Sequence, residues 1–214
     1  MPAPAASTVK DAALVESRRQ ELAATALQLF RAHGYHATSV RQIAEAAGLS
    51  VGSLFNYFRT KEQILHFIYD QTQAVIEEGL QEVLRELAPE PDKALALALD
   101  RYFMLIDRHQ DHTVLVYQEF KSLDRRAKRQ VIDRERRIMD IFGRIVECGI
   151  AQEVFRPHPV AATVHAVAAI GHMWATRRWA LRGAVTLDEF KRAQVTMILQ
   201  GIRRDGAGQG GGDV

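Results

Sequence analysis

Residues 44–65 read AEAAGLSVGSLFNYFRTKEQIL, and this stretch decides the fold of the N-terminal part of the chain. Two short runs of helix-forming residues are separated at Gly48, whose missing Cβ permits the left-handed backbone of a tight turn. Ala44 is small enough for two helices to approach closely, and Leu49 and Leu54 can anchor the turn and the second helix to a core. Two short helices joined by a glycine-containing turn form a helix-turn-helix, a motif that binds the major groove of DNA.

The second helix of this motif presents small and polar side chains on the side that faces away from a core. Serine and asparagine can hydrogen-bond base edges or phosphates, and Gly52 lets the backbone approach DNA closely. Tyr57 and Lys61 suit phosphate oxygens, and Lys61 stands at the start of the next helix, where free N–H groups attract anions. Purely structural roles, such as Ser50 as a helix cap, stay open. The outward residues are Val51, Gly52, Ser53, Asn56 and Tyr57.

Almost all of the remaining chain has the apolar periodicity of helices. Residues 16–34 place Leu22, Ala26 and Phe30 on one face, and residues 38–48 repeat this pattern behind a cap at Thr38 or Ser39. No stretch shows the alternation of a strand. The sequence therefore predicts an all-α fold of about nine helices, three short ones followed by mostly longer ones. The later helices are expected over residues 60–87, 92–108, 112–122, 124–151, 158–182 and 186–203.

Composition and charge limit the classes of protein to which the chain can belong. The chain is 47% hydrophobic and 25% charged, which is ordinary for a globular protein. It contains no apolar run long enough for a membrane span and no signal peptide, and Cys148 is its single cysteine. We therefore expect a cytoplasmic protein without a membrane partner. Residues 1–61 hold seven Lys or Arg and four Asp or Glu, a net charge of +3 that fits an anionic partner or a solvated surface about equally well.

Two sequence stretches resemble the DNA-binding signature of the TetR/AcrR repressor family. They are TSVRQIAEAAGLSVGSLFNYFRTK at residues 38–61 and ALQLFRAHGYHATSV at residues 26–40. The resemblance implies that the helix at residues 50–57 enters the major groove of operator DNA. Phe55 stands where tyrosine is more common, so it either removes a phosphate-binding hydroxyl or packs. The DNA-binding residues so implied are Thr38, Ser39, Arg41, Ser50, Val51, Gly52, Ser53, Phe55, Asn56, Tyr57 and Lys61.

The predicted organisation has four parts. Residues 1–13 and 205–214 are rich in Ala, Pro, Ser or Gly and are expected to be a disordered arm and a disordered tail. Residues 14–61 form the helix-turn-helix DNA-binding domain. Residues 62–204 form an α-helical body for ligand binding and dimerisation.

The body shows no catalytic constellation, so we do not expect an enzyme. His165 and His172 share a helix face, and His109 and His112 are three residues apart, but neither pair has an acidic ligand beside it. A metal site needs three or four ligands, so neither a metal nor a cofactor is predicted. A body with a merely structural role, in a constitutive DNA-binding protein, remains the alternative.

Aromatic residues and methionine are concentrated in the middle helices. They indicate either a well-filled core or an apolar ligand cavity between helices, and in TetR-like proteins such a cavity binds the inducer. The segments at residues 116–136 and 172–183 also resemble regulators that sense acyl-CoA thioesters, and arginines along residues 124–144 would suit the phosphates of such an effector. The predicted ligand-binding residues are Tyr102, Phe103, Ile106, Tyr117, Phe120, Ile138, Phe142, His172 and Trp174.

The last two long helices predict a homodimer. One carries the small-residue run AATVHAVAAIG at residues 161–171, and the other has an apolar stripe that a monomer would expose to water. Pairing two copies buries this stripe in a four-helix interface and places two DNA-binding helices about 34 Å apart, one turn of the double helix. The predicted interface residues are Ala168, Phe190, Met197 and Ile198. Together these expectations describe a dimeric repressor that a small hydrophobic effector releases from a palindromic operator.

Overall fold

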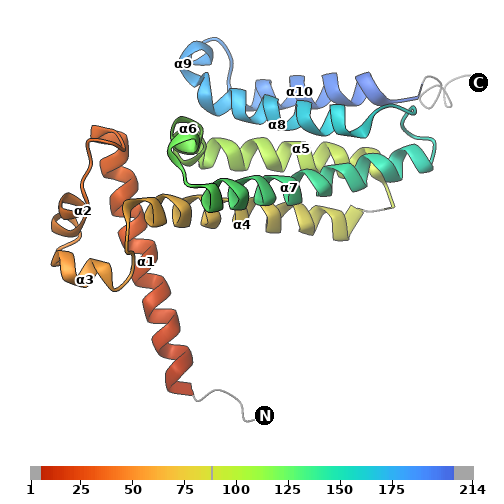
Figure 1. Ribbon diagram of the computed structural model, residues 1–214. Coiled ribbons are helices and arrows are strands. Elements are labelled where there is room, and N and C mark those ends of the chain that lie inside the picture. Colours follow the sequence, from red (N-terminus) through yellow and green to blue (C-terminus); the bar gives the residue numbers. More distant parts are fainter. Residues whose placement is uncertain (1–5, 88, 205–214) are drawn as a thin grey trace, which may run out of the picture. The chain divides into compact units, whose positions relative to one another are not determined.

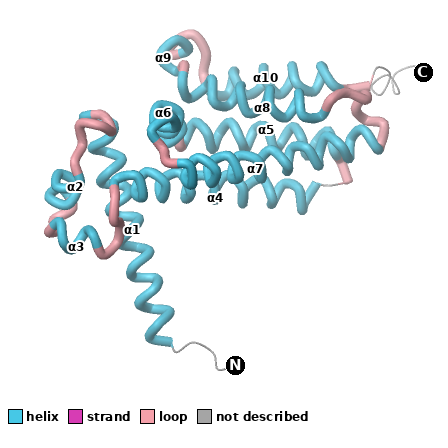
Figure 2. Tube along the Cα trace, viewed as in Figure 1, coloured by secondary structure: helices cyan, strands magenta, loops and turns pink. Residues whose placement is uncertain are grey.

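The structure is a computed structural model that describes residues 6–87 and 89–204. These residues form ten α-helices and one 3₁₀ turn, without a β-strand among them (Figures 1 and 2). The predicted all-α class is confirmed. The helices are α1 (Ala6–His33), α2 (Val40–Ala46), α3 (Val51–Phe55), α4 (Lys61–Leu87), α5 (Pro91–Arg108), α6 (Gln110–Glu119), α7 (Arg125–Ala151), α8 (Val160–Thr176), α9 (Arg178–Leu181) and α10 (Leu187–Ile202), and η1 (Phe120–Ser122) is the 3₁₀ turn.

Two boundaries differ from the sequence-based expectation. Helix α1 begins at Ala6, inside the arm expected at residues 1–13, because no glycine or proline follows Pro4 before Gly34. The single helix expected over residues 158–182 is divided at Arg177 into α8 and the short α9. Residues 1–5 of the arm and the whole expected tail at 205–214 lie outside the described residues.

Packing groups the described residues into two compact units. The N-terminal unit holds residues 6–71 and 115–128, and the C-terminal unit holds residues 72–87, 89–114 and 129–204. The first turns of α4 belong to the N-terminal unit, although the predicted body begins at residue 62. Helices α4, α6 and α7 each continue from one unit into the other.

Helix α5 is the centre of the C-terminal unit and packs against both α8 and α10. Its buried residues form one apolar face, which includes Tyr102 and Phe103. Gly171 of α8 faces Tyr102 so closely that a Cβ at this position would lie 2.5 Å from the ring atom Cε1. The absence of a side chain at Gly171 therefore sets the distance between α8 and α5.

Candidate nucleic-acid interface and effector core

The helix-turn-helix is held by local hydrogen bonds and by a small apolar core. Ser39 begins α2 with a capping box: its Oγ accepts from the Gln42 N–H, and the Gln42 side chain accepts from the Ser39 N–H at 2.8 Å. Gly48 adopts φ +67° in the turn. Ser50 then begins α3 by accepting from the Ser53 N–H at 3.0 Å. These N-caps fix the residues at which α2 and α3 begin.

Most of the predicted DNA-binding residues lie at the surface of the N-terminal unit. Leu54 is fully buried and holds α3 from beneath. Phe55 is 36% exposed on α3, so most of its surface is covered, and its role at the DNA stays a prediction. The exposed residues are Ser39, Arg41, Ser50, Gly52, Phe55 and Asn56, and the half-buried ones are Val51, Ser53, Tyr57 and Lys61.

Thr38 is a correction to the predicted interface. Only 2% of this residue is exposed, and its hydroxyl donates to the Gly34 carbonyl at 2.8 Å. The side chain closes the turn between α1 and α2 and cannot donate to a phosphate. A threonine hydroxyl competes well for nearby backbone carbonyls, and the glycine at the end of α1 brings such a carbonyl within reach.

Lys61 also differs from its predicted role as a phosphate contact. Its ammonium donates to the carbonyls of Tyr35 at 2.7 Å and Thr38 at 2.9 Å. The same nitrogen lies 4.3 Å from the centre of the Tyr35 ring, a cation–π distance. Burial raises the pKa of the Tyr35 hydroxyl, and the nearby charges of Glu62 and Glu119 raise it further. The Lys61 ammonium is therefore engaged inside the N-terminal unit.

Glu119, at the end of α6, is a buried acid that the sequence did not single out. It is 7% exposed, and its Oε2 lies 3.0 Å from Nε2 of His36 in the turn between α1 and α2. A buried carboxylate is costly unless a cation or donors balance it. The only sequence signal was one acidic residue within the mostly apolar run VLVYQEF at residues 114–120.

The predicted ligand-binding residues do not all come together. Tyr117 is 56% exposed on the outward side of α6, because Val116 and Glu119 take its inward side. Phe120 is half-buried, and both it and Tyr117 belong to the N-terminal unit. These two residues therefore lie outside the core of the C-terminal unit, and their ligand-binding role stays a prediction. Those that share the core of the C-terminal unit are Tyr102, Phe103, Ile106, Ile138, Phe142 and Trp174.

Within this core the aromatic rings contact one another directly. The Tyr102 ring lies 5.5 Å from Phe142, and the Trp174 ring lies 4.6 Å from Phe190, measured between centroids. His172 of α8 is half-buried, and burial lowers the pKa of its imidazole although the Glu135 carboxylate partly opposes this shift.

A polar network closes one end of the aromatic core. The Trp174 Nε1–H donates to Asp107 Oδ1 at 2.9 Å. Arg178 of α9 donates to the same oxygen at 2.5 Å and to Gln110 Oε1 at 2.8 Å. Indole N–H groups need such a partner when buried, so the network holds α9 and the end of α5 against the core.

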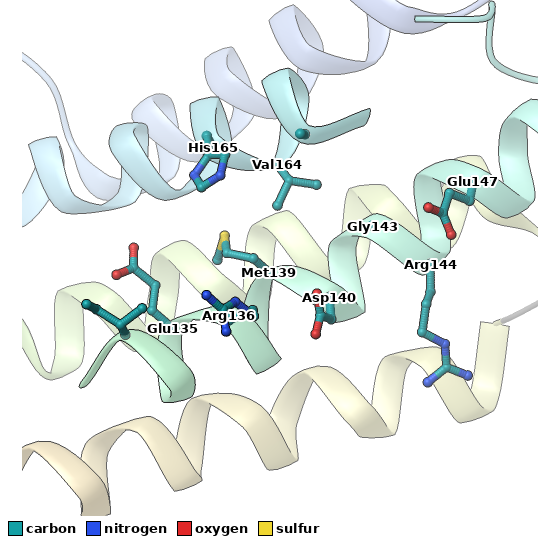
Figure 3. A pocket seen from close by; sticks show the side chains of 11 residues that line it. Glu135, Arg136, Met139, Asp140, Gly143, Arg144, Glu147, Val164 and His165 are labelled. Carbon is teal, nitrogen blue, oxygen red and sulfur yellow. The ribbon is translucent and has the colours of Figure 1, made fainter. Parts of the chain in front are cut away.

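An open groove of about 680 Å³ lies between α7 and α8 (Figure 3). His165 and Val164 extend into it from α8, opposite Met139 and Glu135 of α7. Its charged side chains have mixed sign, with three carboxylates and two guanidiniums. The groove therefore does not offer the uniformly basic surface that the arginines of α7 suggested. Its charged residues are Glu135, Asp140, Glu147, Arg136 and Arg144.

Several arginines of α7 are engaged with acids. Arg134 and Arg137 both pair with Glu77 of α4, at 3.1 and 3.5 Å. Arg136 pairs with Asp133 at 3.4 Å. Part of the basic stretch that the sequence assigned to phosphate binding therefore bridges α7 and α4 within the C-terminal unit.

Comparison with known proteins decides the family. Residues 22–68 match the bacterial regulatory proteins of the tetR family, and residues 88–202, more than half of the chain, match the tetracyclin repressor-like C-terminal domain. The chain belongs to the tetR family of bacterial regulatory proteins. It is a DNA-binding transcription regulator, and the resemblance carried by residues 38–61 is confirmed.

Individual relatives cover nearly the whole of this tetR-family chain. The HTH-type transcriptional regulator HbdR of Aromatoleum sp. (strain CIB) is 29% identical over 91% of the chain and 84% of HbdR. The HTH-type transcriptional repressor KstR2 of Mycobacterium tuberculosis is 25% identical over 90% of the chain and 96% of KstR2. A solved structure of AibR with isovaleryl coenzyme A and operator DNA has the same fold, with a TM-score of 0.72 at 20% identity over 84% of the chain and 97% of AibR.

The predicted dimer residues of this tetR-family regulator differ in exposure. Ala168 and Phe190 are buried within the C-terminal unit, where Phe190 packs on Phe103 at 5.7 Å between ring centroids. Their side chains are covered by their own chain, so the prediction is wrong for both. Met197 is 65% exposed on α10, and Ile198 is half-buried. Phe190 and Met197 are seven residues apart and lie on nearly the same side of α10, so periodicity alone did not show which of them is covered.

Two features are absent from the described residues. No three His, Cys, Asp or Glu side chains of residues 6–87 and 89–204 lie together as metal ligands. In the same part of the chain no helix is both long and apolar enough to cross a lipid bilayer.

Proposed function

We propose that this regulator is a cytoplasmic homodimeric repressor that binds a palindromic operator and leaves it when a small acyl-CoA thioester binds the C-terminal unit. The observation that carries the proposal is the capped helix pair α2–α3, whose exposed face offers hydrogen-bonding groups and a close-approach glycine. A helix of this kind enters the major groove, and two copies read two half-sites about one helical turn apart.

On the DNA side, the proposed contacts divide into two kinds. Ser53 and Asn56 of the α3 region are placed to contact base edges. Arg41 and Tyr57 are placed to contact phosphates, which position the protein without carrying sequence information. The exposure of Arg41 and the half-burial of Tyr57 agree with these roles.

On the effector side, an acyl thioester is supported by two observations. AibR, which shares the fold, was solved with isovaleryl coenzyme A and operator DNA. The core of the C-terminal unit also holds clustered aromatic rings against which an acyl chain could pack, with Tyr102 near Phe142 and Trp174 near Phe190. Such burial stabilises a bound chain by about 0.8 kcal/mol per CH₂ group.

Repression and release follow from linkage between the two sites. An effector that binds more tightly to the conformation unable to bind the operator weakens DNA binding by a fixed factor, and DNA weakens effector binding by the same factor. Three helices, α4, α6 and α7, run continuously between the two units and are the elements available for this coupling.

The test begins with a DNA duplex that the wild-type protein selects from a random-sequence pool. Fluorescence anisotropy then measures the affinity for this duplex with isovaleryl-CoA, with free isovalerate and with CoA alone. We expect isovaleryl-CoA to lower the affinity, and longer acyl-CoA thioesters to act at lower concentrations until the cavity is filled. Equal effects of isovalerate and its thioester would exclude a role for the CoA moiety.

A constitutive DNA-binding protein with a structural body is the second candidate. The observation in its favour is the close packing of the predicted ligand-binding residues, because Tyr102, Phe103 and Phe142 are at most 2% exposed. In that case no thioester would change the affinity for the selected duplex or raise the melting temperature of the protein. An effector that binds the native state raises this temperature by mass action.

A further inference from the structure

The turn between α1 and α2, residues 34–38, controls where α2 begins. Gly34 ends α1 with φ +84°, and its N–H donates to the Phe30 carbonyl at 2.9 Å. The Thr38 hydroxyl returns to the Gly34 carbonyl. Ser39, the cap of α2, follows directly. Any displacement of this turn therefore moves the start of α2 and the exposed residues Ser39 and Arg41.

The Lys61 ammonium binds this turn from the first residue of α4. An ammonium has three donor hydrogens, and two strong contacts go to the carbonyls of Tyr35 and Thr38 at 2.7 and 2.9 Å. A third, longer contact of 3.5 Å goes to the His36 carbonyl. The Tyr35 ring covers the nitrogen at 4.3 Å. All the partners of this ammonium therefore belong to a single turn.

A second contact reaches the same turn from α6. Glu119 lies 3.0 Å from His36 through Oε2 and Nε2. The turn is thus held on one side by α4 and on another by α6, while the DNA-binding helices follow it in the chain. A charge-assisted contact to carbonyl groups is one of the stronger hydrogen bonds available, so Lys61 contributes more to this arrangement than an exposed ion pair would.

We propose that Lys61 is a positioning residue for operator binding, which holds the turn at residues 34–38 in the geometry that aims α2 and α3, and that it does not contact DNA phosphates. The proposal rests on DNA binding through α2–α3. Its place at the N-terminus of α4 suggested that Lys61 binds a DNA phosphate, and the proposal gives it a role inside the protein instead. A phosphate that accepted from this ammonium would compete with its contacts to the turn carbonyls.

Salt dependence separates the two roles. A lysine that binds a phosphate releases counterions, so its loss from both subunits of the dimer reduces the slope of log affinity against log salt by about 0.9 per subunit, or about 1.8 in total. A positioning lysine leaves that slope unchanged and lowers the affinity equally at every salt concentration. For K61M we expect an affinity for the selected duplex that is about tenfold lower, an unchanged slope and a lower melting temperature.

Two further variants serve as controls. K61R keeps the positive charge, but its planar guanidinium cannot direct three donors to the same carbonyls, so we expect it to bind DNA as poorly as K61M. R59M removes an exposed charge two positions earlier and should keep the wild-type melting temperature. Wild-type affinity in K61R, together with a smaller salt slope in K61M, would overturn the proposal. A wild-type protein that selects no duplex would instead overturn the DNA-binding function itself.

A measurement on the wild-type protein covers the case in which K61M does not fold. In protein labelled with ¹⁵N-lysine, the ammonium signal of Lys61 should be protected from solvent exchange without DNA, because its protons are hydrogen-bonded. It should keep its chemical shift when the selected duplex is added. A shift of this signal with coupling to phosphate ³¹P would show a DNA contact and refute the positioning role.

Discussion

Replacing Gly171 by alanine tests the packing of α8 on α5. The new Cβ would lie 2.5 Å from Cε1 and 3.2 Å from Cζ of Tyr102. Ordinary carbon contacts are about 3.5–4.0 Å, so the ring or α8 must move by roughly 1 Å. The ring has little room to move, because Phe103 and Phe142 lie 5.8 and 5.5 Å from it between centroids.

The expected loss of stability is the difference between two effects. Forcing a methyl group into a packed core costs about 1–3 kcal/mol, whereas alanine in a helix is about 1 kcal/mol better than glycine. We therefore expect G171A to lose up to about 2 kcal/mol. For a chain of this size that corresponds to a melting temperature lower by up to about 8 °C.

The matched control is Gly143→Ala in α7. A Cβ at Gly143 would meet nothing within 4 Å, so this variant gains the helix propensity without a clash and should melt about 2–4 °C higher. Circular dichroism at 222 nm follows both transitions at one fixed protein concentration, since a dimer melts at a temperature that depends on concentration. The reasoning fails if G171A is stabilised as much as G143A. A further check is the Y102L/G171A double variant, in which the clash should be relieved.

Three further predictions concern assembly, DNA recognition and pH. Met197→Glu should dissociate the dimer and abolish operator binding while the chain stays folded, whereas Phe190→Glu should unfold the C-terminal unit. Sedimentation measures the first effect and circular dichroism the second. If M197E remains a dimer, Met197 is not part of the interface. Asn56→Ala should change the sequence preference of the selected duplexes, whereas Tyr57→Phe should weaken binding to all duplexes alike. The opposite result in selection experiments would assign the base contact to Tyr57 and the phosphate contact to Asn56. Burial lowers the pKa of His172 below the ordinary histidine value of about 6.5, so the unfolded chain takes up the proton first and stability falls as pH decreases below about 6.5. Urea unfolding between pH 7.5 and 5 should show a smaller decrease for His172→Gln, and an equal decrease in both proteins would assign the effect to other groups.

The helix-turn-helix could be predicted because its determinants are local. Gly48 at the turn and the serine caps act within three or four residues, and such short-range constraints are legible in a single sequence. The same reasoning placed Leu54 in the core and Asn56 at the surface, as the structure shows. Fold class followed from periodicity, which repeats over many turns of helix and tolerates a misplaced boundary.

The direction of individual side chains depended on the tertiary structure. Lys61 and Tyr35 are 26 residues apart, and their contact exists only because the start of α4 returns to the end of α1. Phe190 and Met197 are both apolar residues of α10, yet one meets Phe103 and the other meets solvent. Periodicity shows that a helix has an apolar face. Because Phe190 and Met197 lie seven residues apart on nearly the same side of α10, only packing against α5 determines which of them enters the core of one chain and which remains available to another.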